Sequence, residues 1–324
     1  MEMSFKGYII KRTIYSLVLL FFALSLNFVI FRLAPGNPIQ IVASASRLEP
    51  EMVERLIELW GLKEPAHVQY IRYLKSTLTW NFGYSYYSLE PVSKEIIERL
   101  PNTLLLMGVS LLFACLFGTI FGIYAASKRG SLFDVTSVSV SLFSYALPTF
   151  WMGLLLIYLL GYVFHLFPLA GTMSRPPPTD PIARIFDIGW HLFLPALTLF
   201  LFSYGSWLLL MRSTLLETLH EDYIITARAK GVTERGVLFK HAFRNAMLPL
   251  VTNIALTIPG LLNGAILTET VFSWRGLGLY TWNAIQFNDY PVLQALFFIF
   301  ALVTVVANFV VDIVYGFIDP RIRY

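Results

Sequence analysis

The sequence predicts an all-α, polytopic membrane protein with six transmembrane helices. Of its 324 residues, 56% are hydrophobic and only 14% are charged, with a mean hydropathy of +0.65, whereas soluble globular chains carry roughly a quarter charged residues. A helix needs about 20 apolar residues to cross a bilayer. Six runs without Asp, Glu, Lys or Arg are long enough: Thr13 to Phe31, Leu100 to Ser127, Val135 to Ser174, Ile188 to Met211, Asn245 to Thr268 and Tyr290 to Val311.

The first and third runs need separate comment. The first is longer than a secretory signal core and is followed by Arg32-Leu33 rather than by a small-residue cleavage site, so we expect it to stay as a helix. The third is too long for one perpendicular helix. We therefore predict a span at about 136–164, with one end outside the bilayer core or with a tilt or a bend at Pro148.

The distribution of Lys and Arg predicts the orientation. Positive charge in short loops marks the cytoplasmic side, whereas long external regions cross the membrane despite their charges. Thirteen of the 24 Lys and Arg residues fall on the side that holds both termini. Eight of the others lie in one long region, 32–99, which leaves three for the two shorter loops of that side. We therefore expect a cytoplasmic-membrane protein with both termini in the cytoplasm, and the net charge of +4 needs no nucleic-acid partner.

These predictions divide the chain into three regions. Residues 1–32 form the cytoplasmic N-terminus and first helix, 33–100 form an extracytoplasmic region, and 101–324 form a five-helix core. In the extracytoplasmic region we expect short surface helices, one after Pro50 that ends at Gly61 and a second with one apolar face. The residues of that second face are Tyr70, Ile71, Leu74 and Leu78.

The cytoplasmic loop at 213–246 predicts two short helices joined at Gly231. Ala227 and Ala229 favour the first helix, Gly231 suits its C-terminal turn, and Thr233 can cap the second helix. From these residues alone, a charged surface hairpin is a sufficient interpretation.

Polar residues inside the spans are candidates for a transport pathway, because each is unfavourable in hydrocarbon unless it faces protein or water. Asn253 and Asn263 lie in the fifth run, which Pro259 and Gly264 make irregular, and Glu269 follows directly after its end. Helix packing through small residues and interhelical hydrogen bonds is an equally good reading of them. Asp312, near the end of the sixth run, we expect to be structural. The five His and the single Cys show no paired ligand spacing, so no metal site is predicted.

Ordered motifs along the whole chain resemble the permeases of binding-protein-dependent ABC importers, in the subclass that serves dipeptides, oligopeptides and nickel. The main motif is Ala227-Arg228-Ala229-Lys230-Gly231, followed by His241, Arg244-Asn245-Ala246 and Pro249. Further matches are Pro35-Gly36-Asn37-Pro38, Leu147-Pro148-Thr149-Phe150-Trp151, Leu194-Pro195-Ala196, Glu269-Thr270-Val271-Phe272, Gly276-Leu277-Gly278, Asp289-Tyr290-Pro291 and Asp319-Pro320-Arg321. Two departures, Arg275 in place of a Pro and Asn81-Phe82-Gly83 in place of Gly-Asp-Leu-Gly, lie on the extracytoplasmic side.

The resemblance implies the fold of a type I ABC importer permease and its division of labour. It implies a second, homologous permease, expected to be a diverged sibling in a heterodimer, two ABC ATPase subunits that bind ATP and Mg²⁺, an extracytoplasmic capture protein and the lipid bilayer as partners. The 213–246 loop would be the coupling loop, and no Walker motif occurs in this chain. The implied contact residues are Tyr223, Ala227, Arg228, Ala229, Lys230, Gly231, Glu234, His241, Arg244, Asn245 and Pro249. No catalytic residue and no cofactor of its own are expected.

The substrate remains open at this level. The resemblance favours peptides, with oligosaccharides as an alternative, since 16% aromatic residues would suit sugar stacking as well as membrane interfaces. Nickel is a third option. An ion-coupled secondary transporter is the competing class, but it would need buried acids and an internal repeat, and neither is evident in the sequence.

Overall fold

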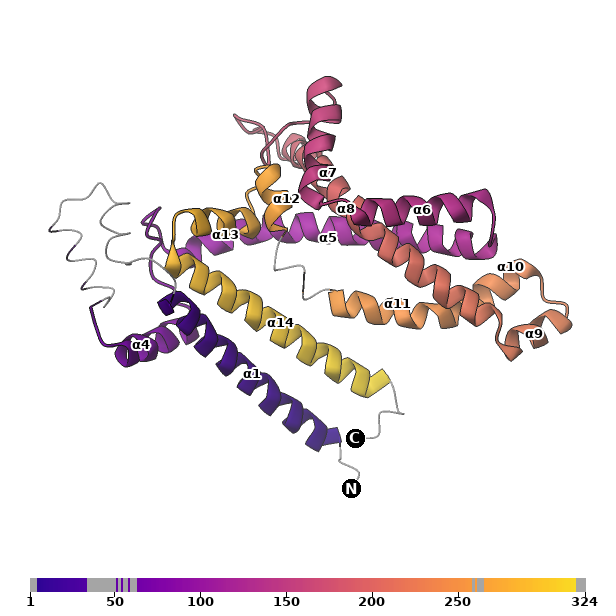
Figure 1. Cartoon of the computed structure of the whole chain (residues 1–324), viewed down its shortest axis with the longest axis horizontal. Helices are drawn as coiled ribbons and strands as arrows, with labels where there is room; N and C mark the ends of the chain where they lie inside the picture. Colours follow the sequence, from indigo (N-terminus) through magenta and orange to yellow (C-terminus); the bar gives the residue numbers. More distant parts are fainter. Residues whose placement is uncertain are drawn as a thin grey trace. The chain divides into compact units, whose positions relative to one another are not determined.

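The structure, a computed structural model, describes residues 5–33, 63–257 and 265–318, together with positions 51, 54, 58 and 260. The described residues form helices and one isolated β-bridge, between Tyr84 and Pro91. The chain divides into two compact units, one of Met1–Pro101 with Gly276–Tyr324 and the other of Asn102–Arg275. The boundary falls within a single helix and again between α12 and α13 (Figure 1).

The long apolar helices agree with the predicted spans. Four described helices could each cross a membrane: Gly7–Arg32, Val92–Ser127, Pro181–Leu219 and Tyr290–Ile313. A bent pair, Leu132–Ala146 with Thr149–Val163, makes a fifth candidate. These five coincide with the first, second, fourth, sixth and third predicted spans. The remaining predicted span, 245–268, contains positions outside the described residues, namely 258–259 and 261–264.

In the first unit, helix α1 (Phe5–Leu33) lies along helix α14 (Tyr290–Ile318) (Figure 1). Buried Leu24 of α1 belongs to a core with Leu296 and Ile299 of α14. Arg12 of α1 forms an ion pair with Asp312 of α14, with 2.9 Å between Nη1 and Oδ2. The structural role predicted for Asp312 is therefore confirmed.

The external region contains one fully described helix, α4 (Ala66–Leu78). The sequence predicts this helix, but its predicted apolar face is only partly buried: Tyr70 and Leu74 are half-buried, whereas Ile71 and Leu78 are exposed. The side turned toward the unit also carries Tyr73, whose hydroxyl accepts a hydrogen bond from Asn27 of α1, and buried Thr77. An aromatic side chain with a polar tip suits this half-buried position better than an aliphatic one. The helix predicted between Pro50 and Gly61 lies largely outside the described residues, as does the Pro35–Pro38 motif.

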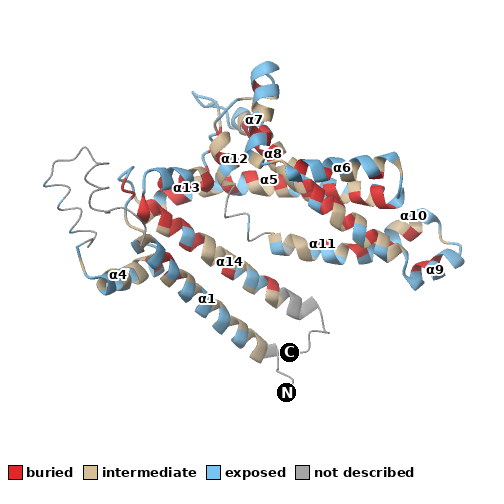
Figure 2. Ribbon diagram, viewed as in Figure 1, coloured by how far each residue is buried: buried red, intermediate tan, exposed pale blue. Residues whose placement is uncertain are grey.

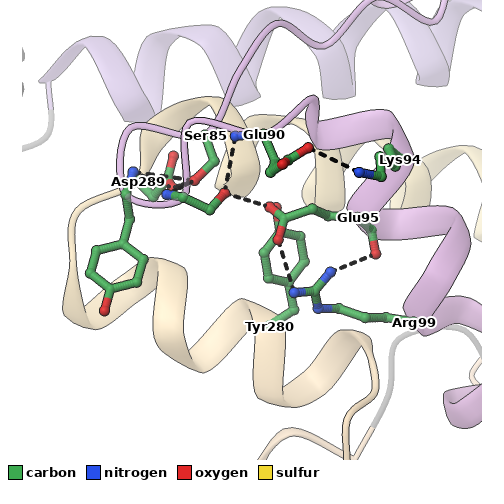
Figure 3. Close-up of polar contacts among 9 residues, drawn as sticks. Ser85, Glu90, Lys94, Glu95, Arg99, Tyr280 and Asp289 are labelled. Atoms are coloured by element: carbon green, nitrogen blue, oxygen red, sulfur yellow. Dashed lines mark hydrogen bonds and ion pairs between the residues drawn. The ribbon is translucent and has the colours of Figure 1, made fainter.

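A buried polar network closes the loop at 84–91 onto the start of α14 (Figure 3). Asp289 is 2% exposed. Its carboxylate accepts hydrogen bonds from the Ser85 hydroxyl and from the backbone N–H groups of Tyr86 (3.0 Å) and Tyr87 (3.3 Å). Burial raises the pKa of Asp289 above its ordinary value, and these hydrogen bonds act in the opposite direction. The loop is thus fixed by a carboxylate that lies about 200 positions away in sequence.

A second carboxylate, Glu95 at the start of helix α5 (Val92–Ser127), extends the network. It accepts from the hydroxyl of Tyr280 (2.6 Å), in helix α13 (Leu277–Gln286), and from that of Ser88 (3.0 Å), and it pairs with Arg99 at 2.9 Å. Burial, followed by the bond to Glu95, raises the pKa of Tyr280, so the phenol stays protonated and remains a donor. Both carboxylates that enter this site therefore have partners, as burial demands.

In the second unit the third predicted span is broken at Pro148. Helix α6 (Leu132–Ala146) ends before Leu147, and helix α7 (Thr149–Leu156) begins after Pro148 and continues as η1 (Ile157–Val163). The two parts are bent by 104°. Leu147 is extended, as a residue before proline prefers, and Pro148 has no N–H to continue the α6 ladder. The predicted bend is confirmed.

Helix α8 (Pro181–Leu219) provides the core of the second unit, and buried residues gather along it (Figure 2). It packs closely on α5 because two glycines of α5 face it. A Cβ on Gly118 would lie 2.6 Å from the Cβ of Trp207, and one on Gly122 would lie 2.7 Å from the carbonyl oxygen of Leu208. At the N-terminus of α6, buried Asp134 accepts two hydrogen bonds from the Arg212 guanidinium of α8, at 2.6 and 2.9 Å.

Candidate functional site

A helical hairpin at residues 220–242 follows the end of α8 (Figure 1). Its first arm, α9 (Asp222–Ala229), ends in a Schellman motif at Gly231, whose φ is +78°. The N–H of Val232 donates to the carbonyl of Ala227 (3.2 Å), and the N–H of Gly231 donates to that of Arg228 (2.9 Å). The predicted turn at Gly231 is confirmed, and glycine is the residue that adopts this φ without strain.

The second arm starts where the sequence predicts but does not end there. The Thr233 hydroxyl accepts from the N–H of Gly236 at 3.3 Å and caps α10 (Glu234–Gly236), which confirms the predicted cap. The helix then continues without a break through η2 (Val237–Ala242) and α11 (Phe243–Thr257). The expected second short helix is therefore the first part of a long one. No proline stands between Glu234 and Pro249, Gly236 is accommodated within α10, and Pro249 itself lies inside α11.

The inner face of the hairpin is apolar and packs on the ends of α8 and α11. Ile224, Ala227, Val237 and Ala242 are buried, and they belong to one core with Leu215 of α8. Ala227 thus lies against the chain's own core, where its small side chain lets α9 approach closely. This packing fixes the hairpin to the two long helices that lead away from it.

The outer face carries most of the sequence-predicted contact residues. Arg228 and Glu234 form a two-point ion pair across the turn, at 2.9 and 3.3 Å. The Asn245 amide donates to the Tyr223 hydroxyl at 2.7 Å and ties α9 to the start of α11. Exposed residues of this face are Tyr223, Arg228, Ala229, Lys230, Gly231, Glu234, Arg244 and Asn245; Pro249 is also exposed and His241 is half-buried. The hairpin therefore presents a polar, mostly cationic surface on a rigid apolar base.

A cavity of about 730 Å³ lies in the second unit. This volume is within the range of roughly 300–1,000 Å³ that is usual for small-molecule sites. The described residues that line it are Met107, Ser110, Leu111, Thr149, Leu199, Phe202, Ser203, Ser206, Trp207, Asn253, Thr257, Gly260, Ala265, Ile266, Leu267 and Thr268. Apart from Gly260 and Ala265, they come from α5, α7, α8, α11 and the start of α12 (Ile266–Val271).

The three pathway candidates have different positions. Asn253 lines the cavity. Glu269 is fully buried, and its carboxylate accepts a hydrogen bond from Thr103 at 2.9 Å, which is a packing contact within the unit. Asn263 lies outside the described residues, as do Pro259 and Gly264. The cavity hydroxyls are not among the residues predicted from the sequence, although the spacing of Ser203 and Ser206 in an apolar run is a signal that could have indicated them.

Metal-ligating side chains do not cluster in the part of the chain that the structure describes, where no group of three or more His, Cys, Asp or Glu residues is placed to hold an ion. Neither the described part of the hairpin nor that of the cavity has the donor set of a metal centre.

Comparison with known proteins relates these features to transport systems. Residues 118–324 match the family model described as "Binding-protein-dependent transport system inner membrane component", and residues 5–107 match the model of its N-terminal region. The chain is 40% identical to the oligopeptide transport system permease protein AppB of Bacillus subtilis, over 98% of this chain and 99% of the relative. It is 38% identical to the di/tripeptide transport system permease protein DppB of Pseudomonas aeruginosa, over 97% and 98%. It is also 35% identical to the glutathione transport system permease protein GsiC of Salmonella paratyphi A, over 98% and 99%.

Proposed function

Because the chain belongs to the family of binding-protein-dependent transport system inner membrane components, we propose that it forms half of the pathway of an ATP-driven importer for di- and oligopeptides. The protein is a membrane-spanning permease subunit, and its family consists of transport subunits that are not themselves enzymes. The first two relatives named above carry peptide transport in their names and align over nearly the whole chain. That full-length similarity is the main support for a peptide substrate.

The hairpin at 220–242 is, in this proposal, the joint to the ATPase. Its exposed Arg228 and Lys230, with Arg244 at the start of α11, would contact polar and acidic groups of an ATPase cleft. Its buried base, which includes Ile224 and Val237, connects it to α8 and α11. A displacement of the hairpin would therefore be carried into these two helices, both of which line the cavity.

The remaining partners follow from the same division of labour. Two ATPase subunits would bind ATP and Mg²⁺, a second, diverged permease would complete the pathway, and an extracytoplasmic capture protein would deliver the peptide. We propose a cytoplasmic-membrane location with both termini and the hairpin on the cytoplasmic side, on the ground of the Lys and Arg distribution.

The proposal is tested by the ATPase activity of the complete reconstituted importer. Its own capture protein would present a panel of peptides, oligosaccharides and nickel. We expect peptides alone to stimulate hydrolysis. If only oligosaccharides or only nickel stimulated hydrolysis, that solute would replace peptides as the proposed substrate. Uptake by this chain without any ATPase would overturn the proposed function as an ATP-driven importer.

The coupling role has a matched control within the chain. Gly231 and Gly130 have the same φ of +78°, and no heavy atom lies within 4 Å of a Cβ built on either. Gly231→Pro should assemble but lose peptide-stimulated hydrolysis, whereas Gly130→Pro, in the turn between α5 and α6, should retain it. Equal loss in both variants would argue for general damage rather than for coupling.

A further inference from the structure

Six residues that carry hydroxyl groups line the cavity of the second unit, among them Thr149 of α7 and Thr268 of α12. Ser110 comes from α5, Ser203 and Ser206 come from α8, and Thr257 comes from α11. The cavity therefore has a polar side built from helices that are far apart in sequence. Phe202 and Trp207 supply apolar surface beside these groups.

Four of the six hydroxyls, those of Ser110, Ser203, Ser206 and Thr257, use their protons within their own helices. Ser110 donates to the carbonyl of Leu106 (2.6 Å), Ser203 to that of Leu199 (2.7 Å), Ser206 to that of Ser203 (2.7 Å), and Thr257 to that of Asn253 (2.7 Å). A hydroxyl has one proton and two lone pairs. With its proton committed to the backbone, each oxygen is left as a hydrogen-bond acceptor.

The described wall carries no formal charge, since Asp, Glu, Lys and Arg are absent from its described lining residues. Asn253 supplies an amide, which contains both an acceptor and a donor, and the hydroxyls of Thr149 and Thr268 can also both accept and donate. The balance of the wall is thus toward neutral acceptors. A solute N–H group would find partners on it, whereas a carboxylate would find few.

We propose that this wall binds the N–H groups of a peptide, its α-ammonium and its backbone amides, and leaves the peptide's carboxylate to water or to another subunit. This inference rests on the proposed function and adds the chemical feature of the substrate that this half of the pathway recognises. Neutral acceptors hold an ammonium or an amide less strongly than a buried carboxylate would. Such a wall lets the peptide leave as well as enter, as a transport pathway requires.

The test compares two peptides in the complete importer reconstituted in proteoliposomes. The probes are trialanine and the analogue in which one backbone amide is N-methylated, each presented at saturation by the capture protein. Wild-type protein should take up trialanine about three- to tenfold faster, since the analogue lacks one donor. The Ser203→Ala, Ser206→Ala double variant should slow the uptake of trialanine by a similar factor and lose the preference between the two peptides.

Two further variants separate the role of the wall from general damage. Thr198→Val removes a hydroxyl that donates to Leu194 at 2.9 Å in the same helix but is not among the residues lining the cavity, so the preference should remain. The double variant Ser203→Thr, Ser206→Thr keeps both hydroxyl oxygens and should retain the preference between the two peptides. The inference would be overturned if the double alanine variant kept the preference between the two peptides, or if Thr198→Val lost it equally. In either case, peptide uptake by the wild-type importer would still uphold the proposed function. If the wild-type importer carries no peptide at all, the proposed function fails and this inference fails with it.

Discussion

The 84–91 loop and the 220–242 hairpin are both short segments with charged residues, but they are held in opposite ways. The loop is fixed by buried carboxylates, Asp289 and Glu95, whose hydrogen-bond partners come from distant parts of the chain. The hairpin is held by local caps at Gly231 and Thr233 and by an apolar base, and its ion pair is exposed. A buried network specifies a single arrangement, whereas an exposed polar face remains available to a partner.

Removing the Asp289 carboxylate should have the largest effect. Asp289→Ala would leave the buried Ser85 hydroxyl and the buried Tyr86 N–H without this acceptor, and each unsatisfied group is unfavourable by about 1–3 kcal/mol. We expect a clear fall in Tm of the purified permease and rapid proteolysis within 84–91. Asp312→Ala, which removes a half-exposed ion pair from the other end of α14, should change Tm much less. Equal changes in both variants would contradict the comparison.

The pH dependence of stability should also reflect the titration of the Asp289 carboxylate. Burial raises the pKa of Asp289, so the folded chain binds a proton more readily than the unfolded chain. The stabilisation that comes from this bound proton is therefore fully present below the unfolded pKa of about 3.9. It is lost as pH rises through the higher folded pKa. As pH rises between those two pKa values, the Tm of wild type should fall relative to that of Asp289→Asn. A difference in Tm that stays constant with pH would show that the carboxyl does not titrate there.

The hairpin should respond in function more than in stability. Gly231→Ala places a side chain at a φ of +78°, which is unfavourable by about 1 kcal/mol. We expect little change in Tm, because the strain is local, but a reduced number of peptides imported per ATP hydrolysed. Gly130→Ala carries the same strain at the same φ outside the hairpin. If it reduces this ratio as much as Gly231→Ala does, the hairpin has no special role in coupling.

The same contrast between local and distant contacts explains which features are predictable from the sequence. Apolar runs, the break at Pro148 and the caps at Gly231 and Thr233 are predictable because each depends on a few neighbouring residues. The predicted apolar face of α4 is only partly right, because hydropathy alone also selects the exposed Ile71 and Leu78, whereas contacts with α1 determine which side is buried.

Features that depend on distant residues are not predictable in this way. In the sequence Asp289 stands out only as part of a motif, and its partners Ser85 and Tyr86 lie about 200 positions away. The cavity hydroxyls escape prediction for the same reason, since Ser110, Ser203 and Thr257 meet only when three helices pack. Local chemistry sets helix ends and breaks, but tertiary packing decides which polar groups share a site.

The smallest expected effect on stability comes from the exposed ion pairs, and it offers the sharpest test of the comparison. Arg228–Glu234 in the hairpin and Arg72–Glu64 in the external region are both exposed or half-exposed, with N–O distances of 2.9 and 2.6 Å. Such pairs contribute about 0–1 kcal/mol and are screened by salt. Double-mutant cycles with alanine should therefore give similar small coupling energies for the two pairs, both reduced at high salt.

The two pairs should differ only in transport. Arg228→Ala removes a cation from the proposed ATPase-facing surface, so peptide-stimulated hydrolysis should fall well beyond the change in stability, whereas Arg72→Ala should leave it unchanged. The measurement is the ATPase activity of the assembled importer at matched occupancy of the ATPase subunits. Because both are Arg–Glu pairs with similarly exposed arginines, unequal loss of stimulation would assign the effect to location. Equal loss would remove the distinction between the two regions.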